Sequence, residues 1–591
     1  MSYNPLLNYY GQDRLRKLNN LFASIYAEIK LPFGFTFRSS FQPRFGNTRD
    51  YNFWDANTTT GSMTYAGGYG TRNDAATMEW MIDNLLKWNK QFGVHSFDLT
   101  LLQNAEKSQS FSSTSQAATF LPTEALGFHG MAFGTLPAVT SNDTKYTGTA
   151  LMARLNYTML DKYLITASIR QDGFSAFGQE NPTAYFPALA FAWKISDESF
   201  FSGIREVINR MKVRLSWGVN GNRDIGIYSA LSQLAANQYY NGSTTLIGTF
   251  ANTLANTALR WERTSSTNLG LDIGFLNDRI DITLDLYNSY TTDLLMTRQL
   301  PRITGFNSVM ANLGKLQNRG LELTVNTNNL TTNNLNWRSN LVFSLNRNKI
   351  LELFGNVSTY TLLNKEFTGD VPDFTNLWFV GEGLDVVWDY DVIGIWQNNE
   401  ADAAAVFLQK PGWLKAHDVN EDGKYTAIHD KKFLGHDTPR FRLGLRNDLT
   451  FLKNFTASLF IRADLGHIGA VPFVNQGTST FDRHSWWSRP YWTPTDPNNE
   501  WPSLGHIYDA FAGGISFWKP KSFVRIQDFS LAYNLPAALV NKMNLNNARV
   551  FISARNLATF TKWPGWDPET SGSVSNLPMP KTFTVGVSLS L

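Results

Sequence analysis

The stretch TNLGLDIGFLNDRIDITLDLYN, residues 267–288, alternates apolar and polar side chains on both sides of a short polar turn. The apolar phase consists of Leu269, Leu271, Ile273 and Phe275 before the turn and of Ile280, Ile282, Leu284 and Leu286 after it. Glycine and aspartate dominate the opposite phase. Because side chains of a strand point alternately to its two faces, this pattern predicts an antiparallel hairpin with one aliphatic face and one acidic face.

The same two-residue period recurs along the chain, for example around 341–345, 441–446 and 455–464, and again in the last eleven residues, KTFTVGVSLSL. Many of these runs are about 10–15 residues long, close to the length of strands that cross a bilayer at a tilt. Roughly 16 segments fit this template. The pattern predicts an all-β protein, a transmembrane antiparallel β-barrel.

Composition supports this fold class. Charged residues make up 17% and aromatic residues 14% of the 591 residues, while the mean hydropathy is only -0.25. Membrane barrels combine these properties because lipid-facing and lumen-facing residues alternate. A large soluble β-rich protein, including a carbohydrate-binding one, is the alternative. The formal net charge of +3 gives no reason to expect a nucleic-acid partner, and the absence of cysteine excludes disulfides and thiolate metal sites.

Connections between the predicted strands are of two kinds. Some are tight turns, and others are long, at about 117–145, 223–258, 354–438 and 465–520. Short periplasmic turns and long extracellular loops are typical of outer-membrane barrels. No linker-like change of composition divides the chain, so we expect a single barrel domain over 1–591.

One long loop contains DVNEDGKYTAIHD, residues 418–430. Oxygen-bearing side chains at alternate positions followed by glycine resemble the first half of a calcium-binding loop. The twelfth position, where an acidic residue belongs, is His429, and the acid follows one residue later. The candidate calcium residues are Asp418, Asn420, Asp422, Lys424 through its carbonyl group, and Asp430. An Asx-rich turn without an ion is the alternative.

A second long loop concentrates aromatic side chains among prolines. Its candidates for contact with a substrate or partner are Trp486, Trp487, Tyr491, Trp492 and Trp501. Packing of the loop on itself is the alternative interpretation.

Charged residues on the polar phase of the strands are expected to line the barrel lumen. These candidates are Arg440, Arg442, Arg446, Arg462, Asp464, Asp281 and Asp285. Motifs of metalloproteases, serine hydrolases and P-loop enzymes are missing. The sequence therefore predicts a protein that is not an enzyme.

Several longer stretches resemble the SusC-like (SusC/RagA) TonB-dependent outer-membrane transporters of Bacteroidota. The resemblance runs from RWERTSSTNLGLDIGFLNDRIDITLDLYNSYTTDLL (260–295) through LPRITGFNSVMANLGKLQNRGLELTVN (300–326) and HDVNEDGKYTAIHDKKFLGHDTPRFRLGLRND (417–448). It continues through YWTPTDPNNEWP (491–502) and VRIQDFSLAYNLP (524–536) to ISARNLATFTKWPGWDPET (552–570).

This resemblance implies a 22-stranded barrel of the outer membrane with an N-terminal plug. It also implies uptake of oligosaccharides or peptides together with a SusD-like surface lipoprotein, energised by TonB, and a possible homodimer. Signal peptide, plug and first strands have no counterpart in these 591 residues, so we expect a truncated C-terminal barrel portion. A passive outer-membrane pore is the alternative function.

Two arrangements are open for such a partial barrel. The strands can form an open sheet with free edges near residues 15–30 and 581–591, or about 16 strands can close into a smaller barrel.

Overall fold

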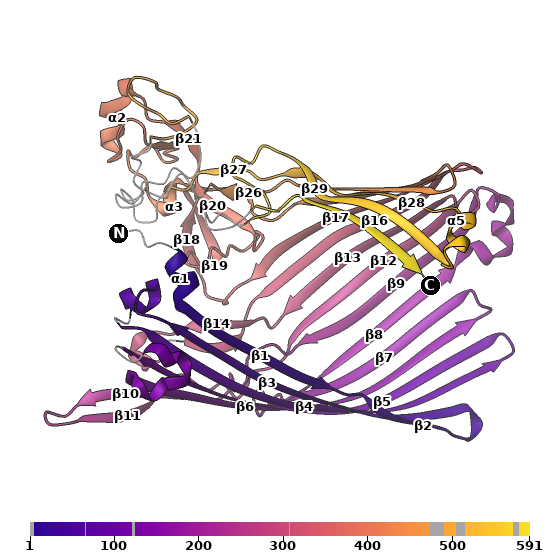
Figure 1. Cartoon of the computed structure of the whole chain (residues 1–591), viewed down its shortest axis with the longest axis horizontal. Coiled ribbons are helices and arrows are strands. Elements are labelled where there is room, and N and C mark those ends of the chain that lie inside the picture. The colour runs from indigo at the N-terminus through magenta and orange to yellow at the C-terminus, as the bar shows by residue number, and fades with distance from the viewer. Residues whose placement is uncertain are drawn as a thin grey trace. The chain divides into compact units, whose positions relative to one another are not determined.

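A computed structural model of the chain describes residues 5–64, 67–120, 124–306, 308–471, 490–503, 515–570 and 578–590. The chain divides into two compact units, which we describe separately. The first contains 1–191, 218–264 and 293–312, and the second contains 192–217, 265–292 and 313–591. Both are built mainly from long antiparallel strands, as the alternation predicted (Figure 1). Whether the two units act as the single domain expected from the sequence stays a prediction.

The first unit is a series of neighbouring strands. In chain order its elements are α1 (Pro5–Gly11), β1 (Gln12–Phe22), β2 (Ile25–Lys30), β3 (Phe35–Trp54), β4 (Tyr69–Phe92), β5 (His95–Ala118), β6 (Thr135–Met159) and β7 (Tyr163–Phe174). Strand β3 pairs with β4, β4 with β5, β5 with β6 and β6 with β7, all antiparallel. Two short hairpins in loops complete it, β10 (Leu234–Tyr240) with β11 (Thr245–Ala251), and β14 (Leu295–Gln299) with β15 (Ser308–Asn312).

Strands β8 (Thr183–Lys194), β9 (Ile208–Asn222) and β12 (Glu262–Phe275) contribute residues to both units. The second unit continues with β13 (Ile280–Thr292), β16 (Lys315–Thr331), β17 (Leu335–Glu352), β24 (Phe441–Phe451), β25 (Phe455–Leu465), β28 (Phe523–Asn534), β29 (Asn547–Thr561) and β30 (Thr582–Ser590). Each strand of this second series pairs with the next.

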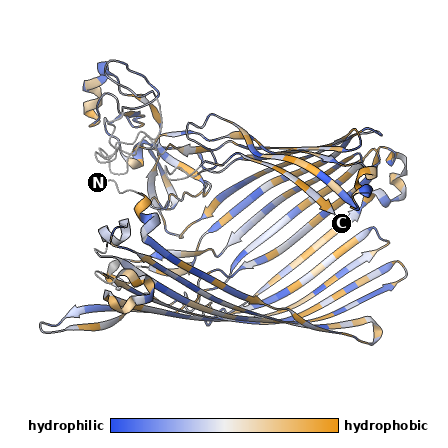
Figure 2. Cartoon of the chain, in the orientation of Figure 1, coloured by the Kyte–Doolittle hydropathy of each residue, from blue (hydrophilic) through white to orange (hydrophobic). Residues whose placement is uncertain are grey.

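The predicted hairpin turn is present, since Leu276, Asn277 and Asp278 all adopt left-handed backbone angles there. Beyond the turn, Ile282 lies opposite Val325 and Leu284 opposite Leu323, so aliphatic side chains meet on one face of the sheet. Figure 2 shows the same alternation of hydrophilic and hydrophobic residues along the strands of each unit. The two faces of the sheet therefore differ in chemistry, as the sequence predicted.

Within the described residues, eighteen strands belong to the large sheet, somewhat more than the roughly 16 expected. In the first unit, β1 and β2 both pair with β3, end to end. In the second unit, the last described strand, β30, pairs with β29. Whether the strands form an open sheet or a smaller closed barrel stays a prediction.

The expected loop at 117–145 is shorter in the structure, because β5 runs to Ala118 and β6 begins at Thr135. These strands are 24 and 25 residues long, well beyond the roughly 9–11 that cross a bilayer. Their outer parts are polar on both faces, as in TSNDTKYTGT (140–149), so no apolar alternation marked them as strand in the sequence. The β5–β6 ladder is therefore longer than a bilayer crossing requires.

The long loops of the second unit carry small elements of their own. These are β18 (Val357–Leu362), β19 (Lys365–Asp370), β20 (Val386–Tyr390), β21 (Val392–Ile395), α2 (Ala401–Val406), β22 (Leu414–Ala416), α3 (Ala427–Asp430), β23 (Lys431–His436), β26 (Ile468–Ala470), β27 (Trp518–Pro520) and α5 (Ala537–Lys542). Their largest apolar cluster includes Tyr390, Leu414, Trp492, Trp501 and Phe517. No helix of the described part of the chain is long and apolar enough to cross a membrane.

Candidate functional site

The polar face of the first unit carries charged side chains on β5 and β7, the two strands that flank β6. Asn104 and Glu106 occupy alternate positions of β5, and Arg170 and Asp172 do the same in β7. Positions on the opposite phase of these strands, such as Leu101 and Ile169, are apolar and exposed. A face of this polarity corresponds to the lumen of a barrel, and the opposite face to lipid.

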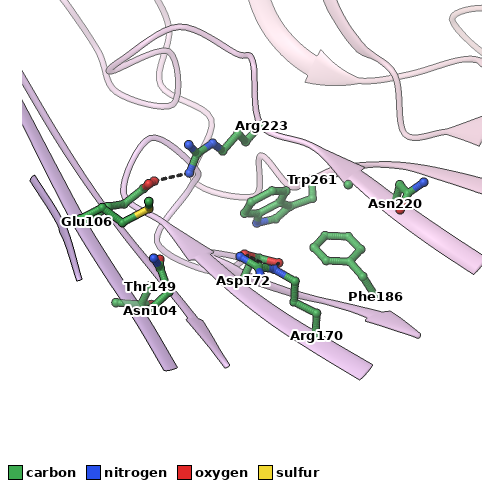
Figure 3. A pocket seen from close by; sticks show the side chains of 11 residues that line it. Asn104, Glu106, Thr149, Arg170, Asp172, Phe186, Asn220, Arg223 and Trp261 are labelled. Atoms are coloured by element: carbon green, nitrogen blue, oxygen red, sulfur yellow. Dashed lines mark hydrogen bonds and ion pairs between the residues drawn. The ribbon is translucent and has the colours of Figure 1, made fainter. Parts of the chain in front are cut away.

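These side chains line a pocket of about 480 Å³ in the first unit (Figure 3). We call it the lumen pocket. Its wall consists of Met81, Asn104, Glu106, Thr149, Arg170, Asp172, Phe186, Asn220, Gly221, Arg223 and Trp261. Six strands and the segments that follow β9 and precede β12 therefore contribute to one cavity.

Two arginine–carboxylate pairs set the electrostatics of the lumen pocket. Arg170 donates from Nε to both carboxylate oxygens of Asp172, at 2.9 and 2.7 Å. Arg223 donates from Nη1 to Glu106 across the pocket (Figure 3). The opposite charges balance, while the Nη groups of Arg170 take no part in the Asp172 bonds. Planar guanidinium and carboxylate groups of this kind suit hydrogen bonding to polar ligands.

An aromatic cluster supports the pocket from one side. Trp261 is 4% exposed and stacks on Phe177 with ring centroids 4.6 Å apart. Phe186 packs edge-on against the same indole at 5.5 Å, and the Arg223 guanidinium lies 5.0 Å from the Phe174 ring. Because Trp261 is buried in this cluster, it holds the charged groups in place more than it offers a stacking surface.

In the second unit, two of the predicted lumen residues have arginine partners. Asp281 accepts a bond from Arg210, and Asp285 lies 3.1 Å from Arg214, which also binds Asp272 at 3.0 Å. Pairing of this kind keeps acidic and basic groups of neighbouring strands together on the polar face.

Among the other predicted lumen residues, Arg446 pairs with Asp448 on its own strand at 2.9 Å. Arg440 precedes β24 and lies 3.9 Å from Asp385 of the loop region. Arg442 is exposed and lies opposite Asp464 in the β24–β25 ladder.

The remaining two, Arg462 and Asp464, belong to a larger ion cluster that the sequence did not indicate. Arg462 binds Asp464 at 2.6 Å and Glu569 at 2.7 Å. Glu569 also accepts a bond from Arg525, whose partner on the other side is Asp567. Arg525 and Asp567 lie more than 40 residues apart, so the sequence does not indicate that they meet. The only signals are the alternation of β28 and the acidic residues of WDPET (566–570).

The aromatic loop divides into three parts. Trp486 and Trp487 lie outside the described residues. Trp492 and Trp501 are buried in the apolar cluster of the loops, and the Trp492 indole donates to Gln397 at 3.1 Å. Their burial favours the packing interpretation. Tyr491 is 41% exposed, and its contact with a substrate or partner stays a prediction.

The candidate calcium loop is ordered by its own hydrogen bonds. Asp430 is fully buried and accepts the N–H groups of Val419 at 2.9 Å and Thr426 at 2.7 Å. Asp418 accepts the N–H of Gly423 through Oδ2. Buried Asp418 Oδ1 and Asn420 Oδ1 have no hydrogen-bond partner in the described structure.

These observations fit calcium only in part. Lys424 and Asp422 lie on the loop as the spacing requires, with the Lys424 N–H bonded to Asp422. No group of three His, Cys, Asp or Glu side chains converges anywhere in the described ranges. The unpartnered oxygens of Asp418 and Asn420 favour an ion. Asp430 speaks against its own role as a ligand, because both of its oxygens already accept hydrogen bonds.

A protein-family model described as "TonB dependent receptor-like, beta-barrel" matches residues 2–557. The chain belongs to this family of TonB-dependent receptor barrels. Proteins of the family reside in the outer membrane, so the polar face described above lines a barrel interior and the apolar face meets lipid. The predicted localisation and fold class are thereby confirmed.

Curated proteins with similar sequences support this family membership. TonB-dependent receptor P3 of Formosa agariphila is 28% identical over 97% of this chain, and SusC of Bacteroides thetaiotaomicron is 28% identical over 76% of it. The match covers 58% of the first and 44% of the second. The chain thus spans about three fifths or less of the length of these relatives. The SusC-like resemblance of the sequence is confirmed.

A solved structure has the same fold. The structure described as the RagAB peptide transporter matches with a TM-score of 0.81 at 21% identity, covering 98% of this chain and 62% of that one. At this identity the likeness establishes the fold alone.

Proposed function

We propose that the chain forms barrel strands of a SusC-like outer-membrane importer for oligosaccharides or peptides. In the intact protein, uptake would be energised by TonB and assisted by a SusD-like surface lipoprotein. Family membership and the SusC and RagAB relatives support this proposal. The chain itself would serve as a passage and not as an enzyme.

The observation that carries the proposal is the lumen pocket. It lies on the polar face of the barrel wall and combines two balanced ion pairs with the amides of Asn104 and Asn220. Its volume of about 480 Å³ suits a few sugar units or amino-acid residues, within the usual size of ligand pockets. A charge-balanced wall binds polar cargo without demanding a charged one.

The test uses the intact transporter carrying Arg223→Ala in a host that lacks its own copy. Uptake of labelled neutral oligosaccharides and of labelled peptides is measured at equal surface expression. Loss of the Arg223–Glu106 pair should slow uptake of the transported class about tenfold, the equivalent of roughly 1.4 kcal/mol. Leu101→Ala on the opposite face is the matched control and should leave uptake unchanged.

Two results would contradict the proposal. If the Arg223→Ala variant takes up cargo as fast as the unchanged protein, the lumen pocket does not contact the cargo during transport. Uptake that continues after TonB is deleted would favour a passive pore.

We also propose that the loop at 418–430 binds calcium and is stiffened by it. The unpartnered oxygens of Asp418 and Asn420 support this, and calcium prefers such oxygen ligands. Calorimetric titration of the protein with Ca²⁺ should show binding that Asp418→Ala abolishes. Equal heats in both proteins would refute the site.

A further inference from the structure

A second polar pocket lies among the long loops of the second unit. Its volume is about 500 Å³, and we call it the loop pocket. Its wall consists of parts of the segment 393–400, Lys415 of β22 and residues 497–499. None of these residues belongs to the lumen pocket. Because long loops of outer-membrane barrels lie outside the cell, the loop pocket belongs to the extracellular surface.

A local irregularity of β21 brings one side of the loop pocket together. The register of β21 with β22 shifts between Val392 and Gly394. Gly394 allows Asn499 to approach closely, because a β-carbon at this position would lie 2.5 Å from Asn499 Oδ1. The same oxygen accepts the N–H of Ile395 at 2.8 Å. The segment around Asn499 is thereby fixed against β21.

The side chain of Gln397 fixes the same segment at a second point. From Nε2 it donates to the carbonyl oxygen of Ile395 at 2.8 Å and to that of Asn498 at 3.2 Å. Its own oxygen accepts the indole N–H of Trp492, which is buried in the apolar cluster of the loops, at 3.1 Å. The wall of the loop pocket is therefore built on the packed part of the loops.

The carboxamide oxygens that shape the loop pocket are used by the protein itself. Asn498 Oδ1 accepts the N–H of Trp501 at 2.8 Å, and the oxygens of Asn499 and Gln397 are occupied as described above. The amino groups of Asn498 and Asn499 donate to no protein group of the described residues. Asn399 is exposed, and its side chain makes no hydrogen bond to that part of the chain. The loop pocket thus offers mainly free N–H donors.

An ion pair contributes the charges of the loop pocket. Lys415 Nζ lies 2.6 Å from Glu400 Oε1 and 4.5 Å from the centre of the Trp396 ring. The hydrogen bond from Lys415 and a second one from the Gln397 N–H lower the pKa of Glu400, so this carboxyl group stays ionised. The two opposite charges cancel. A ligand of either sign therefore finds no net attraction in this pocket.

A sugar hydroxyl satisfies such a set of groups. Its oxygen accepts from an amide or an ammonium group, while its own hydrogen turns toward water or a neighbouring hydroxyl. A peptide is a poorer match, because each of its backbone N–H groups needs an acceptor and the carboxamide oxygens fixed in the wall are already used. Ile393 and Pro497 add apolar surface for the C–H face of a sugar ring, and the volume suits a few sugar units.

We propose that the loop pocket is a second binding site of the transporter, specific for uncharged oligosaccharides. The site rests on the proposed import function and selects one of the two cargo classes named there. It holds the oligosaccharide at the outer surface before transport, through the free amino groups of Asn498 and Asn499 and the Lys415–Glu400 pair.

The test uses the purified intact transporter and a panel of uncharged tetra- to hexasaccharides, with calorimetry as the readout. Asn498→Asp and Asn499→Asp keep the oxygen that accepts a backbone N–H and remove only the free amino group. Each should weaken binding of the oligosaccharide about tenfold. All variants are also measured together with Arg223→Ala, so that the lumen pocket does not mask the loss.

Asn241→Asp is the matched control. The oxygen of Asn241 likewise accepts backbone N–H groups, those of Ser243 and Thr244, and the residue does not line the loop pocket. This variant introduces the same negative charge and should bind the oligosaccharide as tightly as the unchanged protein.

Asn399→Ala is a second probe of the site. The described residues make no hydrogen bond to this side chain, so its removal should leave the unfolding temperature unchanged. Binding of the oligosaccharide should still weaken about threefold.

Several results would overturn the proposal. They are a panel without any bound oligosaccharide, equal affinities of the unchanged protein and both aspartate variants, and neutral peptides whose binding these variants weaken instead. The import function is tested separately through the lumen pocket. Uptake that depends on Arg223, together with normal oligosaccharide binding by Asn498→Asp and Asn499→Asp, would support import and reject the loop pocket as a binding site.

Discussion

Arg525 donates from Nη2 to both carboxylate oxygens of Asp567 at 2.8 Å. The arginine is 1% exposed and also donates from Nε to Thr559 at 2.9 Å. Strand β28 is thereby joined to β29 and to the segment that follows β29. Since Glu569 connects Arg525 with Arg462, the cluster also includes β25.

Arg525→Met should strongly destabilise the barrel, because it leaves Asp567 buried without its partner. Breaking a buried ion pair from one side costs about 3–5 kcal/mol. The free energy of unfolding is measured from the urea dependence of tryptophan fluorescence in detergent. Arg555→Met is the control, because Arg555 pairs with Asp528 at the surface, where such pairs contribute less than about 1 kcal/mol. Equal losses in the two variants would show that burial of Arg525 contributes nothing.

The sequence predicted the strands better than the contacts between them. Alternation at 267–288 determines which side chains share a face, because the strand period is two. It contains no information about which distant segment supplies a partner, so Asp281 could be assigned to the lumen but its bond to Arg210 could not be foreseen. The lumen pocket was missed for the same reason, since Glu106 and Arg223 lie 117 residues apart.

Asp430→Asn should loosen the loop at 418–430. Asp430 accepts backbone N–H groups of Val419 and Thr426 on its two oxygens. Asparagine keeps one of these oxygens, but its amino group replaces the other and cannot accept the second N–H. Loss of a buried hydrogen bond to a charged group costs about 1–3 kcal/mol. Hydrogen exchange of residues 417–430 should accelerate accordingly. Asp422→Asn, at an exposed position of the same loop, is expected to change exchange little, and an equal effect would contradict the role of Asp430.

Acid should weaken the structure around His467. Burial lowers the pKa of His467 below its usual value of 6.5, and the positive charges of Lys521 and Arg442 act in the same direction against Asp464. The folded protein therefore keeps this imidazole neutral, while the unfolded chain takes up a proton below pH 6.5. The resulting stability is fully present above pH 6.5 and decreases as the pH falls toward the folded pKa.

His467→Gln tests this linkage because glutamine cannot take up a proton. Unfolding temperatures of the variant and the unchanged protein are compared between pH 7.5 and pH 5. Carboxylates titrate in both proteins, so the difference between the two curves isolates the histidine. The unchanged protein should lose more stability on acidification, and parallel curves would refute the effect.

Trp492→Ala and Tyr491→Ala should have opposite consequences although the two residues are neighbours. Trp492 is buried among loop side chains, and removing a buried tryptophan costs about 3–5 kcal/mol. Tyr491 is exposed, so its loss should leave stability within about 0.5 kcal/mol. Limited proteolysis of the loops should thus accelerate only in Trp492→Ala. If Tyr491 contacts substrate, Tyr491→Ala should lower binding of oligosaccharides or peptides while its proteolysis stays normal. Normal binding would exclude Tyr491 from the substrate contact.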